Sequence, residues 1–145
     1  MAKIDFWQLS RDPVEKVTAL IAQRVLDQGE RLLVVSASDE QRAAIARGLW
    51  QAGPDSFLAN GEARAPGAER QPILLSDSLE AANGATHAIF ADGTFRDAPD
   101  FSRTFLLFDE ASLRHARQTW KALSDREGVE RAFFRQDGGK WVKVA

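Results

Sequence analysis

The sequence predicts an α/β protein with a mostly parallel central sheet flanked by helices, similar to a Rossmann fold without a nucleotide-binding loop. Apolar segments of strand length alternate with amphipathic segments of helix length, which favours this class. In residues 31–35, Arg31 is followed by the continuous apolar run Leu-Leu-Val-Val, which is typical of a strand covered on both faces. The 145 residues, of which 44% are hydrophobic, fit one domain (residues 1–145) with a sizeable core.

The first half of the chain is expected to alternate strand and helix twice. A strand at Ile4–Leu9 precedes Asp12 and Pro13, which favour a helix start, and Gly29 suits the end of a helix over Val14–Gln28. The predicted inner face of that helix holds Val17, Leu20, Ile21 and Val25. Ser38 and Gln41 resemble a capping box at the start of a second helix, which ends near Gln51.

The second half is expected to add more strands and one further helix. Residues 59–72 hold two Gly and two Pro and predict an excursion of the chain rather than a core element. Short strands follow at Ile73–Leu75 and Ala88–Ala91, and a strong buried strand at Phe105–Phe108. A helix over Glu110–Glu127 ends before Gly128, and residues 132–144 suggest a terminal hairpin or two edge strands.

The helix before Gly128 carries two stripes at helical spacing. Leu113, Ala116, Trp120 and Leu123 form an apolar stripe, with Arg114, Arg117 and Lys121 along its edge. A basic edge beside an indole suits an acidic peptide with an apolar tip. The same pattern also fits the outer helix of an ordinary domain.

Charge is distributed unevenly along the chain. Residues 111–145 carry eight Lys and Arg against four Asp and Glu, a net charge of +4, whereas residues 1–110 carry −6. An anionic partner is therefore expected at the C-terminal part. The acidic remainder disfavours a protein wrapped in nucleic acid, which needs a broad basic surface.

The motifs of common α/β enzymes do not occur in the sequence. The turn after the first strand holds no glycine, and the chain contains neither GxGxxG nor GxSxG. His87 and His115 lack metal-ligand spacing, so we expect no metal and no cofactor. Without Cys, a secretory signal or a membrane-length apolar run, the chain is expected to be cytoplasmic and to make no membrane contact.

Several short elements together resemble the chi subunit of bacterial DNA polymerase III holoenzyme, an accessory protein of the clamp loader. They occur in this order: Asp5-Phe6-Trp7-Gln8-Leu9, Leu49-Trp50, Asp55-Ser56-Phe57, Asn83-Gly84, Phe101-Ser102-Arg103 and Ala116-Arg117-Gln118-Thr119-Trp120-Lys121 before Gly128. The likeness spans nearly the whole chain. It implies a DNA replication subunit with no catalytic activity of its own, within a DNA-directed DNA polymerase holoenzyme.

The resemblance implies two protein partners. One is the acidic C-terminal tail of the single-stranded DNA-binding protein, which ends in an aromatic residue with a free carboxylate. Arg117, Trp120 and Lys121 match its site, and spacing adds Arg114. Association with single-stranded DNA would then be indirect.

The other implied partner is the psi subunit, which forms a heterodimer with chi and ties it to the clamp loader. Trp50 and Phe57 match the psi-facing surface, although both could instead cap the core. After Phe57 the family tends to continue with Pro-His, whereas this chain has Ala59-Asn60.

Two other functions fit parts of the sequence. A direct single-stranded nucleic-acid-binding protein would stack bases on Trp120 or Trp141 beside the same basic residues. An enzyme with an unfamiliar motif would turn over a nucleotide or phosphoester without a partner. The acidic residues 1–110 disfavour the first alternative, and the missing phosphate loops disfavour the second.

Overall fold

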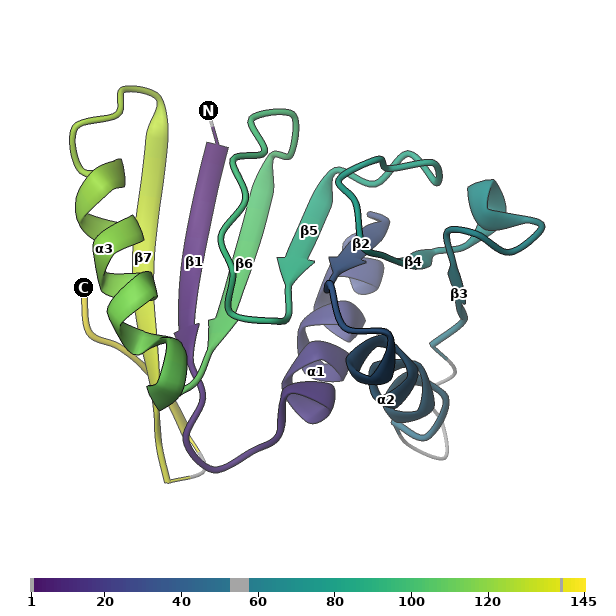
Figure 1. Cartoon of the computed structure of the whole chain (residues 1–145), viewed down its shortest axis with the longest axis horizontal. Helices are drawn as coiled ribbons and strands as arrows, with labels where there is room; N and C mark the ends of the chain where they lie inside the picture. The colour runs from purple at the N-terminus through teal and green to yellow at the C-terminus, as the bar shows by residue number, and fades with distance from the viewer. Residues whose placement is uncertain (1, 53–57, 139) are drawn as a thin grey trace.

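The computed structural model describes residues 2–52, 58–138 and 140–145, and its strands form one mixed sheet (Figure 1). The strands are β1 (Ala2–Gln8), β2 (Leu32–Val35), β3 (Asn60–Glu62), β4 (Ile73–Ser76), β5 (His87–Phe90), β6 (Arg103–Phe108), β7 (Val129–Asp137) and β8 (Lys140–Lys143). Within the described residues the order is β3-β4-β2-β5-β6-β1-β7-β8. Every pair is parallel except β7 and β8. The predicted fold class is confirmed.

Three α-helices cover the two faces of this sheet in the described part of the chain. Helices α1 (Val14–Asp27) and α2 (Asp39–Trp50) pack on one face, where Ile21 and Ile45 join a buried cluster around Trp7 and Ile89. Helix α3 (Leu113–Leu123) packs on the other face, over β1 and β7 (Figure 1). Successive residues of β1 serve opposite faces, since Phe6 belongs to the α3 side and Trp7 to the other.

The helix starts follow the capping chemistry of the sequence. Ser38 Oγ accepts a hydrogen bond from the N–H of Gln41 at 3.1 Å, as its spacing predicts. The Gln41 side chain does not reach back to Ser38; instead it donates to the carbonyl of Ala91 at 3.0 Å. Asp109 accepts from the N–H of Ser112 and begins a 3-10 turn, η2 (Glu110–Ser112), that leads into α3. Helix α3 thus begins and ends within the predicted range of Glu110–Glu127.

Besides the capping box of Ser38 and Gln41, two further sequence expectations were wrong in detail. Residues 59–72 are not all an excursion, because Asn60–Glu62 form the edge strand β3 and Ala68–Arg70 form the 3-10 turn η1 with Ala68 buried. Leu20 is 40% exposed rather than part of the inner face of α1. Asn60, one of the two residues that depart from the family pattern, is buried and donates to the carbonyl of Leu58 at 3.0 Å. The terminal hairpin is confirmed as β7 and β8.

Candidate peptide-binding site on helix α3

Helix α3 presents its basic residues to solvent while its apolar side holds it on the sheet. Ala116 and Leu123 are buried against the sheet. Arg114, Arg117 and Lys121 are exposed along the neighbouring edge of the helix. The structure therefore brings these three predicted site residues together on one side, as residues three and four apart in a helix must be.

A shallow hollow of about 540 Å³ lies along this basic edge. Its lining consists of Glu110, Leu113, Arg114, Arg117, Gln118 and Lys121. Leu113 gives the hollow one half-buried apolar wall, and Glu110 is its acidic member. In the described part of the chain, none of the three basic residues forms an ion pair. Their charges are therefore available to an anionic ligand.

Trp120, the fourth predicted site residue, is half-buried and does not line that hollow. Its ring packs edge-on against Phe6 of β1, with ring centroids 5.2 Å apart, and against Phe133 of β7, at 5.7 Å. The guanidinium of Arg131 lies 4.0 Å from the centroid of the Trp120 ring and also donates to the Trp120 carbonyl. A contact of this kind contributes on the order of 1 kcal/mol. Trp120 thus joins the basic helix edge to β7.

Arg131 is a candidate binding residue that the helix pattern alone did not indicate. It lies on the same face of β7 as Phe133, two residues along the strand, and that face packs on α3. Strand alternation relates the two residues in the sequence. Arg131 and Phe133 lie beside Trp120, however, only because β7 pairs with β1, and this pairing is a tertiary contact.

Trp50, one of the two residues predicted for a second protein surface, belongs to a helix on the other face of the sheet. Trp50 is the last residue of α2 and is 47% exposed, whereas Phe57 lies outside the described residues. A groove of about 500 Å³ runs between the outer sides of α1 and α2, with Ala19, Leu20 and Leu58 in its mainly apolar lining. Trp50 is thus exposed on the α2 side of the molecule, and Leu20 adds apolar surface from α1.

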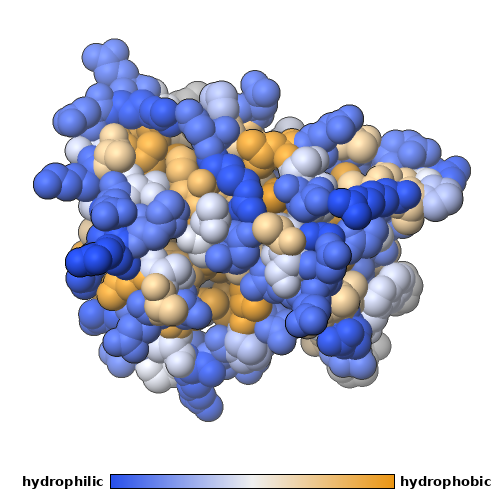
Figure 2. Space-filling model, in the orientation of Figure 1, coloured by the Kyte–Doolittle hydropathy of each residue, from blue (hydrophilic) through white to orange (hydrophobic). Residues whose placement is uncertain are grey.

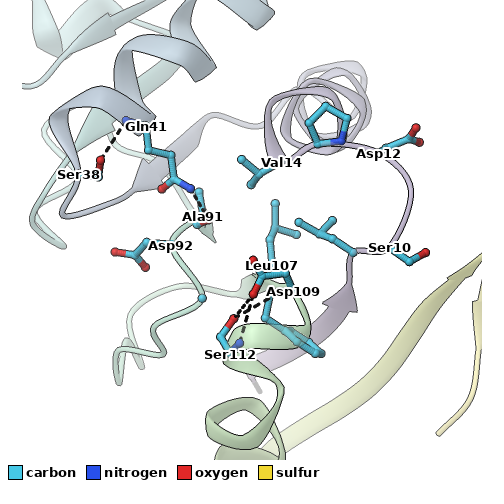
Figure 3. A pocket seen from close by; sticks show the side chains of 14 residues that line it. Ser10, Asp12, Val14, Ser38, Gln41, Ala91, Asp92, Leu107, Asp109 and Ser112 are labelled. Carbon is cyan, nitrogen blue, oxygen red and sulfur yellow. Dashed lines mark hydrogen bonds between the residues drawn. The ribbon is translucent and has the colours of Figure 1, made fainter.

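A further crevice of about 440 Å³ lies at the carboxyl ends of β1, β5 and β6, where open α/β sheets commonly bind ligands (Figure 3). Val14 and Leu107 point toward the middle of the crevice (Figure 3). In the space-filling view, hydrophobic surface lies low in the centre, between α3 and α1 (Figure 2). Asp92 and Asp109 lie at its rim. Burial alone would raise the pKa of Asp92, but hydrogen bonds from Arg96 and the N–H of Ala37 outweigh it and lower the pKa below its usual value. The negative charges of these two carboxylates disfavour the binding of a phosphate group in the crevice.

Two further observations concern the described residues only. They contain no group of three or more His, Asp or Glu side chains placed to hold a metal ion. No helix among them is long and apolar enough to cross a membrane.

Fold and surface together define an α/β protein of the doubly wound kind with a basic hollow on its last helix. The sequence matches, over residues 1–130, the model of the family described as DNA polymerase III chi subunit, HolC. Because the match covers most of the chain, the chain belongs to this family. Membership supports a role as a subunit of DNA polymerase III in DNA replication. No curated protein matches the sequence.

Proposed function

We propose that this chain is an adaptor of the DNA polymerase III clamp loader that couples the polymerase to coated single strands. It binds the acidic C-terminal tail of the single-stranded DNA-binding protein on the α3 side of the sheet and the psi subunit on the other side. The observation that carries the proposal is the basic hollow of α3, where Arg114, Arg117 and Lys121 surround an apolar wall and form no ion pair within the described residues.

The chemistry of the hollow supports a ligand with both carboxylates and an apolar end. Guanidinium groups bind carboxylates through charge-assisted hydrogen bonds. Leu113, which lines the hollow, offers apolar contact to a terminal ring. A few charged contacts and one sheltered ring typically give micromolar affinity, about −8 kcal/mol, that weakens as salt increases.

Direct stacking of nucleic-acid bases is less favourable on these tryptophans. Arg131 covers a face of the Trp120 ring, and Phe6 and Phe133 pack against it. Trp141 packs against Trp7 with ring centroids 4.6 Å apart. Base stacking needs an open ring face, which these contacts restrict.

The test is titration of the protein with a synthetic acidic peptide that ends in Pro-Phe with a free carboxylate. Arg117→Ala is expected to weaken binding by about 1.5–3 kcal/mol, because a charge-assisted contact is lost. Arg24→Ala is the matched control, since Arg24 is an exposed arginine on α1 at the other face of the sheet. Amidation of the peptide should weaken binding in the same way.

Two outcomes would contradict the tail site. Equal affinity in Arg117→Ala and Arg24→Ala would remove the α3 edge from the site. Binding of bare oligonucleotide, with a steep salt dependence and no binding of the peptide, would instead support the nucleic-acid-binding alternative.

The proposal for psi rests on the exposed apolar surface of α1 and α2. Trp50 and Leu20 are two of the large hydrophobic side chains that the described residues leave exposed, and an aromatic anchor of this kind is common in protein interfaces. Trp50→Ala is expected to weaken copurification with the psi subunit by at least tenfold while leaving acidic-peptide affinity unchanged. Loss of both would indicate a general defect in folding, and loss of neither would exclude Trp50 from the interface.

A further inference from the structure

The hairpin of β7 and β8 exposes a second apolar and basic surface on the side of the sheet that carries α3. Phe133 faces this side, since its ring stacks on Phe6 with centroids 6.0 Å apart. Arg135, two residues further along β7, shares that face and pairs with Val142 of β8. Val144 donates its N–H to the carbonyl of Phe133 at 2.8 Å. We call Phe133, Arg135, Val142 and Val144 the hairpin face.

The hairpin face leaves unusual apolar area open to solvent. Val142 is 41% exposed and Val144 is 46% exposed. Trp141, in contrast, lies on the opposite face of β8 and packs against Trp7. Arg135 is exposed beside them and forms no ion pair within the described residues. Apolar surface with a cation beside it suits a ligand that alternates carboxylates with apolar groups.

The hairpin face is linked to helix α3 through the contact between Arg131 and Trp120. Arg131 precedes Phe133 on the same face of β7, and its guanidinium lies on the ring of Trp120. Trp120 in turn is the helix neighbour of Lys121 and lies three residues after Arg117. Arg131 and Trp120 thus connect the two surfaces. Three carboxyl groups lie near this connection: Glu110 in the hollow, Asp137 at the end of β7, and that of Ala145, whose oxygen accepts the N–H of Phe133 at 3.1 Å. The basic residues Arg114, Arg117, Lys121, Arg131 and Arg135 outnumber them.

We propose that the hairpin face binds the residues that precede the terminal aromatic residue of the acidic peptide, which makes the site longer than the hollow of α3. This inference rests on the proposed function. Four strand residues span roughly 13 Å, so β8 offers length for about four more peptide residues in an extended conformation. Because the family match ends at residue 130, Arg135 and all of β8 lie outside it.

The hairpin is held in place before any peptide arrives. The side-chain oxygen of Gln136, which is 4% exposed, accepts hydrogen bonds from the N–H groups of Arg11 at 3.0 Å and Asp12 at 3.1 Å. The Gln136 amide also donates to Asp12 at 2.8 Å. A surface that is already ordered loses little conformational freedom on binding.

The experiment compares two synthetic peptides with the same free C-terminal Phe, one of four residues and one of nine, with acidic and apolar residues in the added part. The longer peptide is expected to bind the unaltered protein at least fivefold more tightly. Arg135→Ala and Val142→Ser should each reduce this gain to less than twofold while leaving the affinity for the short peptide unchanged. Lys143→Ala is the matched control, because Lys143 pairs with Phe134 and lies on the opposite face of the hairpin.

The outcomes separate this inference from the proposed function. Equal affinity for both peptides in the unaltered protein would overturn the longer site and leave the hollow of α3 intact. The longer site would also be overturned if Lys143→Ala reduced the affinity advantage of the nine-residue peptide as much as Arg135→Ala does. A general effect of charge would then explain that advantage. Failure of both peptides to bind would overturn the proposed function and the inference together. Unchanged thermal unfolding of each variant shows that the fold is preserved.

Discussion

At the residue scale, the buried carboxylate of Asp5 depends on one cationic partner. Asp5 lies in the internal strand β1 with no solvent exposure, and Arg103 of β6 binds it through two hydrogen bonds, at 2.5 and 3.2 Å. The other Asp5 oxygen has no hydrogen-bond partner within the described residues. The Arg103 guanidinium also lies 4.9 Å from the centroid of the Phe105 ring. Removing Arg103 would therefore leave a buried, uncompensated charge.

Arg103→Ala is expected to lower the free energy of unfolding by about 3 kcal/mol, measured by urea denaturation. Arg126→Ala is the control, because Arg126 pairs with Asp97 on the surface at 2.9 Å and surface pairs contribute little. If both substitutions left stability equally unchanged, Asp5 would not need its partner.

From the sequence, only the part of the candidate site that depends on spacing within one helix could be predicted. Helical spacing was sufficient to place Arg114, Arg117 and Lys121 on one edge, and the structure has them there. It could not show that Trp120 turns toward β7, because its neighbours Phe6 and Arg131 come from distant parts of the chain. Strand order determines which residues lie beside a given side chain of α3. The pattern of a single helix contains no information about strand order.

At the element scale, α1 and α2 pack so closely that one position leaves little room for a side chain. A Cβ atom on Gly48 of α2 would lie 3.1 Å from Cβ of Glu15 in α1, closer than ordinary van der Waals contact. Any branched residue there would separate the two helices and change the groove between them.

Gly48→Val is expected to lower the free energy of unfolding by about 1–3 kcal/mol, because overpacking forces the helices apart. Ala43→Val is the matched control, since Ala43 is an exposed residue of the same helix and reports only the helix propensity of valine. Thermal and urea unfolding of the two variants should differ, and equal losses would show that the helix contact can relax.

The elements that sequence reasoning found are those with strong patterns. The apolar run of β2 and the amphipathic helices are confirmed. Strand β3 was missed because Asn60, Gly61 and Glu62 have low strand propensity. Its three residues pair with β4 because the sheet offers a free edge there, which is a tertiary effect.

At the scale of the whole molecule, the two proposed surfaces lie on opposite sides of one sheet. Helix α3 and the hairpin face are on one side, while α1 and α2 are on the other. A peptide bound at the proposed α3 site would therefore lie on the opposite side of the sheet from Trp50. The alternation of strands and helices predicted the fold class, but strand order depends on crossovers that skip neighbours and could not be derived from the sequence.

The position of β1 between β6 and β7 also determines when the fold can be completed. Phe6 pairs with Leu106 of β6 and Phe133 of β7, residues made long after it. At a synthesis rate of roughly 5–20 residues per second, the first strand waits about 5–20 s before β6 is complete. During this time β2, β4 and β5, which are closer in sequence, can pair with one another. Closing the loop to β1 then requires contacts of long sequence separation, which are typical of slow folding. Until β6 and β7 arrive, the apolar side chains of β1 lack the two neighbours that bury them.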